Sequence, residues 1–189
     1  MEILSNMTAK EISLDKAKKD KLFYFLANVV VYRESDGRCL ILLRSKNEKV
    51  HPGKFGVVGG KLEWKDLDPQ KPSRVHGDVL DYLDAVENLL IRETREEAGI
   101  EIEPKLRYIN SVAYIRPDGV PAVLVKFAAK YAGGEVRLEE GAFDGYAWVD
   151  AEEVKTRDCL EGIAEEVAAA IRHFSREVSR VLDRPVAAA

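Results

Sequence analysis

The sequence is poor in cysteine and contains no long hydrophobic run. Only two cysteines, Cys39 and Cys159, occur in 189 residues, and they lie far apart in stretches that lean apolar. This pattern favours two reduced, partly buried thiols over a disulfide framework, as in a cytosolic protein. Residues 1–20 are polar and charged, and no run of 18 apolar residues occurs in the sequence. We therefore expect neither export nor a membrane span, and the cytoplasm is the expected location.

The sequence also lacks an excess of positive charge. Its 29 lysines and arginines face 33 aspartates and glutamates, which gives a net charge of −4. This balance excludes the general electrostatic footprint of a nucleic-acid-binding protein. An acidic protein that handles phosphates needs metal ions or local basic side chains to offset its own charge. The length and the hydrophobic content of 46% fit one globular domain with a sizeable core.

The first third of the chain predicts an antiparallel hairpin followed by a strand that contains glycines. Residues 23–32 (FYFLANVVVY) are rich in β-branched and aromatic side chains, which are typical of a buried strand. A turn at 34–37 (ESDG) leads into a return strand over 39–43 (CLILL). After a polar loop over 45–55, residues 56–63 (GVVGGKLE) predict a third strand, which glycines interrupt.

The rest of the chain predicts a long central helix, further strands and a C-terminal helix. Apolar residues at helical spacing indicate a helix that begins with Asp78 as N-cap and ends at Ala98, before Gly99. Residues 64–77 are expected to form a loop. The other expected elements are strands at 101–114, 121–132 and 145–149, a short helix opened by Asp150, and a long helix over 159–182. Strands on both sides of a central helix indicate an α/β (α+β) fold with a mixed sheet between helices.

The stretch 92–100 (RETREEAGI) carries the predicted chemistry. On an α-helix Glu93, Glu96 and Glu97 are three or four residues apart and project to one side. Carboxylates clustered in this way repel one another without a counter-charge, and hard oxygen ligands are what Mg²⁺ or Mn²⁺ requires. Arg92 is expected to hold Glu96 through a bidentate pair. Taken alone, the same string is also typical of a solvated surface helix, so its context decides.

Gly59 and Gly60 supply that context, because a glycine pair at the end of a strand lets backbone approach a ligand closely. With this helix, the pair resembles the Nudix hydrolases. Their signature is Gly, five residues, Glu, seven residues, then Arg-Glu-aliphatic-any-Glu-Glu-any-Gly-aliphatic. Gly60 corresponds to the first glycine, and Asp84 stands where the family has its first glutamate. The second half of the signature is matched by Arg92, Glu93, Glu96, Glu97, Gly99 and Ile100, while Thr94 occupies the usual aliphatic position.

Spacing is the largest departure from this signature. Between Gly60 and Asp84 lie 23 residues where the family has five, so about 18 are inserted in a strand-to-helix loop, where added length is tolerated best. The segments 51–60 and 143–150 also resemble the flanks of the family's box. The resemblance implies an N-terminal extension over 1–21, a Nudix domain over 22–182 and a tail at 183–189. Within the domain we expect an insertion loop at 64–81 and a C-terminal helix at 158–182.

The resemblance implies a Nudix-like α/β/α sandwich and a pyrophosphohydrolase. The expected reaction is a metal-assisted attack of water on a nucleoside diphosphate linked to another moiety, with a (d)NTP or related nucleotide as the expected substrate. Mg²⁺ is the implied cofactor, with Mn²⁺ as the alternative. The implied metal ligands are Glu93, Glu96, Glu97 and the Gly60 carbonyl, and the implied catalytic residues are Glu93, Glu96, Glu140 and Arg92. Substrate contacts are expected from Arg44, Gly59, Gly60 and Glu63.

Several residues outside the helix keep two interpretations. Family members often add a carboxylate from the loop before the last strand, and here Glu140 is favoured over Glu139 and Asp144. Each of these residues is equally well explained as an ordinary exposed acid on a loop. Arg44 stands where family members often carry a basic residue near the phosphates, yet an ordinary strand-end arginine explains it as well. Aromatic residues in this part of the fold either stack on a ring of the substrate or pack in the core; they are Phe55, Trp64 and Tyr114. The expected partner is a small-molecule nucleotide, without nucleic acid or membrane, and a homodimer is left open.

Three other functions compete with hydrolysis. An isopentenyl diphosphate isomerase on the same fold would need a catalytic cysteine, and neither Cys39 in its strand nor Cys159 in its helix fits that role. A Nudix-fold regulator usually loses the box carboxylates and carries an extra DNA-binding domain, for which 189 residues leave little room. A catalytically inactive module that binds a nucleotide or ADP-ribose stays open as the alternative.

Overall fold

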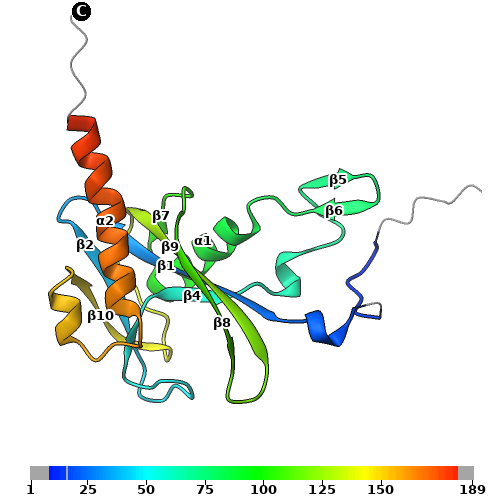
Figure 1. The fold of residues 1–189 in the computed structure, drawn as a ribbon, viewed down its shortest axis with the longest axis horizontal. Helices are drawn as coiled ribbons and strands as arrows, with labels where there is room; N and C mark the ends of the chain where they lie inside the picture. Colours follow the sequence, from blue (N-terminus) through cyan, green and yellow to red (C-terminus); the bar gives the residue numbers. More distant parts are fainter. Residues whose placement is uncertain (1–8, 16, 183–189) are drawn as a thin grey trace, which may run out of the picture.

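The computed structural model describes residues 9–15 and 17–182, and a mixed eight-stranded sheet forms its centre (Figure 1). The strands are β1 (Tyr24–Arg33), β2 (Arg38–Arg44), β3 (Phe55–Gly56), β4 (Val58–Lys61), β7 (Glu101–Ile102), β8 (Arg107–Ile115), β9 (Pro121–Gly133) and β10 (Phe143–Val149). The main path runs β10–β2–β1–β9–β7, with β3 paired to β2, β4 to β1 and β8 to β9. Strand β1 is antiparallel to β2 and β4 and parallel to β9, so the sheet is mixed.

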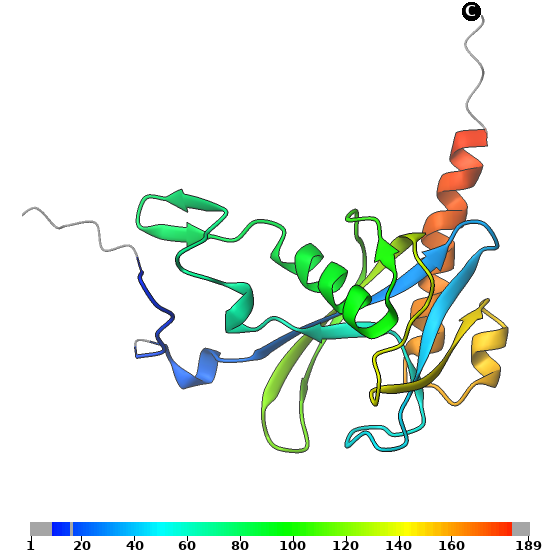
Figure 2. The ribbon, with the colours of Figure 1, turned by 180° about the vertical axis from the view of Figure 1, so that it is seen from behind.

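Two helices, α1 (Ala85–Ala98) and α2 (Ile163–Leu182), cover opposite faces of this sheet (Figures 1 and 2). Strand β1 explains the arrangement, because successive side chains point to opposite faces. Ala27, Val29 and Val31 belong to the core on the α1 side. Val30 and Tyr32 belong to the core on the α2 side, where the Tyr32 ring stacks on Phe174 with centroids 5.1 Å apart. The predicted layers, a mixed sheet between helices, are confirmed.

The early strands lie close to where the sequence predicts them. The hairpin of β1 and β2 pairs Tyr32 with Cys39, as expected for the turn between them. The third predicted strand is divided into two short strands, because its two parts pair with different neighbours. Strand β3 pairs with β2, and β4 pairs with β1. Cys39 is buried and Cys159 half-buried, and both are free thiols, as expected.

The predicted start of the central helix is wrong. Helix α1 begins at Ala85, and its N-cap is Asp84, not Asp78. Residues 79–81 form strand β6 (Val79–Asp81), which pairs with β5 (Arg74–His76) in a separate two-stranded sheet. The predicted loop therefore contains structure, including the 3₁₀ helix η2 (Trp64–Asp66). The prediction failed because Val79 and Leu83 fit a helical period by coincidence. Both side chains are exposed, so they do not form part of an apolar helix face.

Other boundaries shift for local reasons. The strand predicted over 101–114 is divided into β7 and β8, with Pro104 between them. Helix α2 begins at Ile163 rather than 159, because Gly162 has φ +88, outside the helical region, and Cys159 instead forms a bridge with Phe55. The short helix after Asp150 is the 3₁₀ helix η3 (Glu153–Thr156), and the Asp150 carboxylate accepts the amides of Glu152 and Glu153.

The insertion and the N-terminal segment lie together at one end of the molecule, and the β5–β6 hairpin projects from the body (Figures 1 and 2). The N-terminal segment contains a short 3₁₀ helix, η1 (Lys19–Lys21). The division into an extension, a domain and a tail stays a prediction, and its tail at 183–189 lies outside the described residues. In the described part of the chain, none of the helices has the length and apolar character that crossing a membrane requires.

Candidate active site

Helix α1 presents its apolar side to the sheet and its acidic side to a pocket. Leu89, Leu90 and Ala98 are buried against the core. Thr94, at the position where the family signature has an aliphatic residue, is buried too, and its hydroxyl donates to the Leu90 carbonyl at 2.6 Å. This internal hydrogen bond satisfies the hydroxyl, so threonine fits a buried position on the helix.

Glu97 lies in the last turn of α1, and its side chain is largely removed from solvent. Its Oε2 atom accepts the backbone amide of Gly59 at 3.1 Å, which links α1 to β4. Burial raises the pKa of Glu97 to about 8, and the Gly59 amide opposes this by stabilising the ionised form. A buried carboxyl with this pKa is uncharged at neutral pH unless a cation approaches it.

Glu93 lies one turn earlier and packs against Gly60. A Cβ atom added to Gly60 would lie 2.2 Å from the Glu93 Oε1 atom, so no larger residue fits there while Glu93 keeps its position. Burial raises the pKa of Glu93, and the charge of Arg92 opposes the shift. The predicted approach of the glycine pair to the acidic helix is therefore present, despite the insertion between them.

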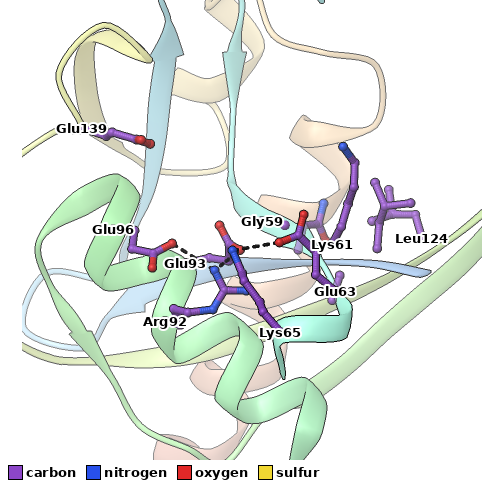
Figure 3. Close-up of a pocket in the computed structure, with 13 residues that line it drawn as sticks. Gly59, Lys61, Glu63, Lys65, Arg92, Glu93, Glu96, Leu124 and Glu139 are labelled. Carbon is purple, nitrogen blue, oxygen red and sulfur yellow. Dashed lines mark hydrogen bonds and ion pairs between the residues drawn. The ribbon is translucent and has the colours of Figure 1, made fainter. Parts of the chain in front are cut away.

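Arg92 lies among the carboxylates (Figure 3). Its Nη1 atom is 2.8 Å from Glu93 Oε1 and 3.0 Å from Glu96 Oε2, so one nitrogen forms ion pairs with both carboxylates. The expected pair with Glu96 is present, but the bidentate geometry is wrong, because Nη2 lies 3.4 Å from Asp66 instead. Asp66 belongs to η2, so this contact ties the insertion to the acidic helix.

These side chains line a pocket of about 450 Å³, a volume typical of small-molecule sites. Of the predicted site residues, it brings together Gly59, Gly60, Glu63, Arg92, Glu93 and Glu96. Lys61 and Lys65 also line it, and neither is among the residues predicted from the sequence (Figure 3). Lys61 directly follows the glycine pair, which was the available signal. Lys65 carries no signal in the sequence, because it enters the site through η2.

The loop before β10 places Glu139, rather than Glu140, at the pocket. The Glu139 amide donates to the Glu97 carbonyl at 3.1 Å, and the Glu139 charge helps to raise the pKa of Glu97. Glu140 is exposed and is absent from the described residues that line the pocket. Asp144 accepts the Lys46 amide at 3.0 Å and so anchors a different loop. The preference for Glu140 over its neighbour is therefore not supported by the geometry.

Arg44 ends β2, as predicted, but points to its own loop. Its Nη2 atom lies 2.8 Å from Glu48, and its Nε donates to the Val50 carbonyl at 2.9 Å. It does not line the pocket, although its charge lowers the pKa of Glu97 slightly against the effect of burial. Its expected contact with substrate therefore stays a prediction.

The acidic helix lies within a stretch of the chain that matches a known domain family. The NUDIX domain model matches residues 73–178, more than half of the chain. The chain belongs to the Nudix family. The predicted membership of the Nudix hydrolases is thereby confirmed. The match begins inside the insertion, so the correspondence of Gly60 to the first glycine of the Nudix signature depends on its packing against Glu93.

Two curated relatives of this Nudix chain are both named NAD-capped RNA hydrolase NudC. The protein from Chromobacterium violaceum is 28% identical over 147 residues, which cover 78% of this chain and 44% of the relative. The protein from Pseudomonas fluorescens is 30% identical over 81 residues, which cover 43% of this chain and 28% of the relative. The chain thus spans less than half the length of these relatives.

Solved structures confirm the Nudix fold. A MutT protein from Methanosarcina mazei Go1 superposes with a TM-score of 0.54 at 20% identity, covering 85% of this chain and 99% of that one. The Nudix domain of Shewanella oneidensis NrtR, solved with ADP ribose, gives 0.60 at 15% identity, covering 85% and 92%. At these identities the likeness concerns the fold alone.

The donor atoms of this Nudix site fit a hard divalent cation. The carboxylates of Glu93, Glu96 and Glu139 line the pocket, whereas Glu97 does not line it and is buried near Glu93 and Glu139. Carboxylate oxygens are ligands that suit Mg²⁺ or Mn²⁺. The raised pKa of Glu97 is what a buried ligand carboxyl shows in the absence of its ion. However, no three His, Cys, Asp or Glu side chains in the described part of the chain are arranged to hold a metal. Arg92 pairs with Glu93 and Glu96, so an ion has to compete with its guanidinium for these carboxylates.

Proposed function

We propose that this chain is a divalent-metal-dependent hydrolase of a diphosphate bond in a nucleotide-type substrate. The observation that carries the proposal is the buried Glu97 carboxyl, which accepts the amide of Gly59, while Gly59 and Glu93 themselves line a pocket of a size typical of small-molecule sites. A structural role alone does not explain it, because burying an ionisable carboxyl without a cation costs free energy. Membership of the Nudix family supports the same reaction class.

Different residues would bind the metal and the phosphates of the substrate. Glu93, Glu96 and Glu97, with the Gly60 carbonyl, would hold Mg²⁺ or Mn²⁺, which neutralises phosphate charge and lowers the pKa of a bound water. Lys61, Lys65 and Arg92 supply positive charge to the diphosphate from the same pocket. When substrate binds, Arg92 would pair with phosphate oxygens instead of the carboxylates of Glu93 and Glu96. Glu139 replaces Glu140 as the proposed proton acceptor, because it lies at the pocket and interacts with Glu97.

Two classes of substrate deserve direct comparison. A (d)NTP is the substrate expected for a MutT-like enzyme. The curated relatives instead bear a name that refers to an NAD cap, a dinucleotide with an internal diphosphate. Both classes contain a nucleoside diphosphate linked to another moiety, and the cytoplasm is the proposed setting.

A non-hydrolytic binding module is the second candidate. It is favoured by one observation, the Arg92 guanidinium paired with Glu93 and Glu96 where a metal would need those carboxylates. In such a module Arg92 would hold the acidic side chains permanently, and the pocket would bind a nucleotide without turnover. The two candidates differ in metal binding and in catalysis.

Turnover of a substrate panel separates them. The panel contains dNTPs, ADP-ribose, NADH, nucleotide sugars, dinucleoside polyphosphates and NAD-capped RNA, each with Mg²⁺, and release of phosphate, diphosphate or mononucleotide is measured. Glu97→Gln is expected to lower kcat/KM by more than about 100-fold, since loss of even an outer-shell partner of a metal typically costs about 10- to 100-fold. Glu87→Gln, in the first turn of the same helix, is the matched control. Wild-type turnover in Glu97→Gln would reject the role of this helix. Nucleotide binding without any turnover would favour the module.

A further inference from the structure

We call the pocket lined by Glu93, Glu96 and Glu139 the carboxylate pocket. A second cavity, of about 760 Å³, lies next to it. We call it the aromatic groove and define it by side chains from three separate segments of the chain. Those segments are the start of β1 with the residue before it, the insertion around η2, and the turn between β8 and β9. The defining residues are Phe23, Tyr24, Trp64, Leu67, Val120 and Pro121.

The aromatic side chains of this groove are unusually accessible. Trp64 is 56% exposed, Phe23 51% and Tyr24 47%, whereas Phe174 in the core is 2% exposed. Covering apolar surface contributes about 25 cal/mol for each Å², so an occupant of the groove gains free energy from these rings. Exposed apolar side chains scattered singly need no explanation, but a contiguous set that lines a cavity is typical of a binding site.

The aromatic groove is continuous with the carboxylate pocket. Lys61 and Glu63 line both cavities, and Figure 3 shows them on the side of Arg92 away from Glu139. The Lys61 ammonium lies 6.0 Å from the centroid of the Tyr24 ring, so it stands where the two cavities meet. Strand β4 makes the connection, because Gly60 faces the acids and the chain continues through Lys61 towards Trp64.

Charge and shape together define the ligand that fits. The carboxylate pocket and Lys61 suit an anionic end bound with a metal, and the groove beyond Lys61 suits an apolar, planar end. We infer that the aromatic groove binds the planar ring of the nucleotide whose diphosphate lies in the carboxylate pocket. The inference rests on the proposed function and extends it to the ring.

The lining of the groove also predicts how the ring is recognised. Among the described residues that line it, the charged side chains are Lys61 and Glu63, both at the boundary with the carboxylate pocket. The other lining side chains are apolar or aromatic. Stacking on aromatic side chains tolerates different bases, because each base has a π-face. The groove therefore holds a ring without distinguishing adenine from other bases.

Binding of two non-hydrolysable probes tests this inference without turnover. The probes are methylenediphosphonate, which has no ring, and α,β-methylene-ADP, both titrated calorimetrically into the full chain with Mg²⁺. In the wild type, α,β-methylene-ADP is expected to bind at least about 10-fold more tightly, the order of one base–aromatic stack. Trp64→Ala, and Phe23→Ala on the facing segment, should each remove most of that difference and leave methylenediphosphonate binding unchanged. Tyr146→Ala removes an equally exposed ring from β10, at the far edge of the sheet, and should change neither affinity.

Each result has one meaning. Equal affinities of the two probes in the wild type, or an unchanged ring contribution in both groove variants, would overturn the inference and leave the proposed hydrolysis standing. Failure of methylenediphosphonate to bind with Mg²⁺ would count against the proposed function instead. A concentration-dependent dimer that Trp64→Ala abolishes, with no ring contribution, would assign the groove to a second copy of the chain. The guanine and uracil analogues should bind within about threefold of the adenine analogue, because stacking does not read base edges.

Discussion

The carboxylate of Glu97 accepts the backbone amide of Gly59 across 3.1 Å, which joins the acidic helix α1 to the glycine strand β4. These two residues lie 38 positions apart in the sequence, with the insertion between them, yet the hydrogen bond places them together. It fixes one carboxylate oxygen of Glu97 while burial keeps the group away from water. A carboxyl in this position suits the binding of a cation and reduces the stability of the cation-free protein, because its ionised form is poorly solvated.

The pH dependence of stability follows from this position. The pKa of Glu97 is about 8 in the folded protein, against an ordinary value of 4.5 for a glutamate, so the folded state binds the extra proton between those values. Its contribution to stability is complete below the unfolded pKa and is lost as pH rises through 8. Glu97→Gln keeps an acceptor for Gly59 without the charge. We expect its melting temperature, measured with EDTA, to exceed that of the wild type at pH 9 and to approach it at pH 5. A variant less stable at both pH values would contradict the assignment.

Gly60 should resist substitution because of Glu93. The added Cβ of Gly60→Ala would lie 2.2 Å from the Glu93 carboxylate, which has to move away. Because Glu93 is a flexible side chain at a pocket wall, we expect little loss of stability but a loss of Mg²⁺ affinity of about 10-fold or more, as for disturbed metal ligands. Gly145→Ala is the control, since its Cβ would meet Leu43 at an ordinary 3.9 Å. Mg²⁺ titration by calorimetry gives both affinities, and equal values would remove the proposed role of Gly60.

The sequence predicted the parts of this site that depend on local geometry. Glu93, Glu96 and Glu97 share a helix face because the helical period is local, and Gly59 and Gly60 were found from their position at a strand end. Choosing Glu139 over Glu140 required the long-range hydrogen bond between the loop and the end of α1, which sequence spacing does not show.

The central helix shows a second limit. Its apolar spacing continues upstream through Leu83 and Val79, but those residues follow or belong to a hairpin that pairs with itself. Periodicity alone does not distinguish a short strand from a further turn of helix. The shared contacts of Arg92 were equally hidden, because Asp66 reaches it from the insertion.

The buried pair of Lys126 and Glu166 predicts a pH-dependent loss of stability. Lys126 Nζ lies 2.6 Å from Glu166 Oε1 between β9 and α2, and the Asn28 amide donates to the other oxygen at 3.1 Å. Burial raises the pKa of Glu166 against the effect of Lys126. Lys126→Met leaves the carboxylate without its cation, so we expect the free energy of unfolding at pH 8 to fall by about 3–5 kcal/mol. The loss should be smaller at pH 5, where a larger fraction of Glu166 is protonated than at pH 8.

Urea unfolding of the Lys126 variant at the two pH values measures this difference. Adding Glu166→Gln to Lys126→Met should recover much of the loss at pH 8, because the buried charge is then absent. A loss of the same size at pH 5 and pH 8, unaffected by the second substitution, would mean that packing of the lysine stem dominates.

The β5–β6 hairpin should be dispensable, whereas the anchored part of the insertion should not. Its strands pair with each other, the β5 side chains are all exposed, and a Cβ at Gly77 would meet no atom within 4 Å. We expect replacement of residues 74–81 by a Gly-Ser linker to change the free energy of unfolding by no more than about 0.5 kcal/mol, as for ordinary surface changes. Hydrolysis should persist, because none of the replaced residues lines the carboxylate pocket.

Asp66→Ala provides the contrast within the same insertion. It removes the 3.4 Å contact with Arg92 and the hydrogen bond of 2.8 Å from the Glu63 amide that begins η2. Loss of such a cap costs about 1 kcal/mol, and here it also releases the segment that carries Lys65 and Trp64. We therefore expect a raised KM for nucleotides in Asp66→Ala and an unchanged KM in the hairpin replacement. If the hairpin replacement raises KM as much as Asp66→Ala does, the hairpin contacts the substrate and the division of the insertion into two parts is wrong.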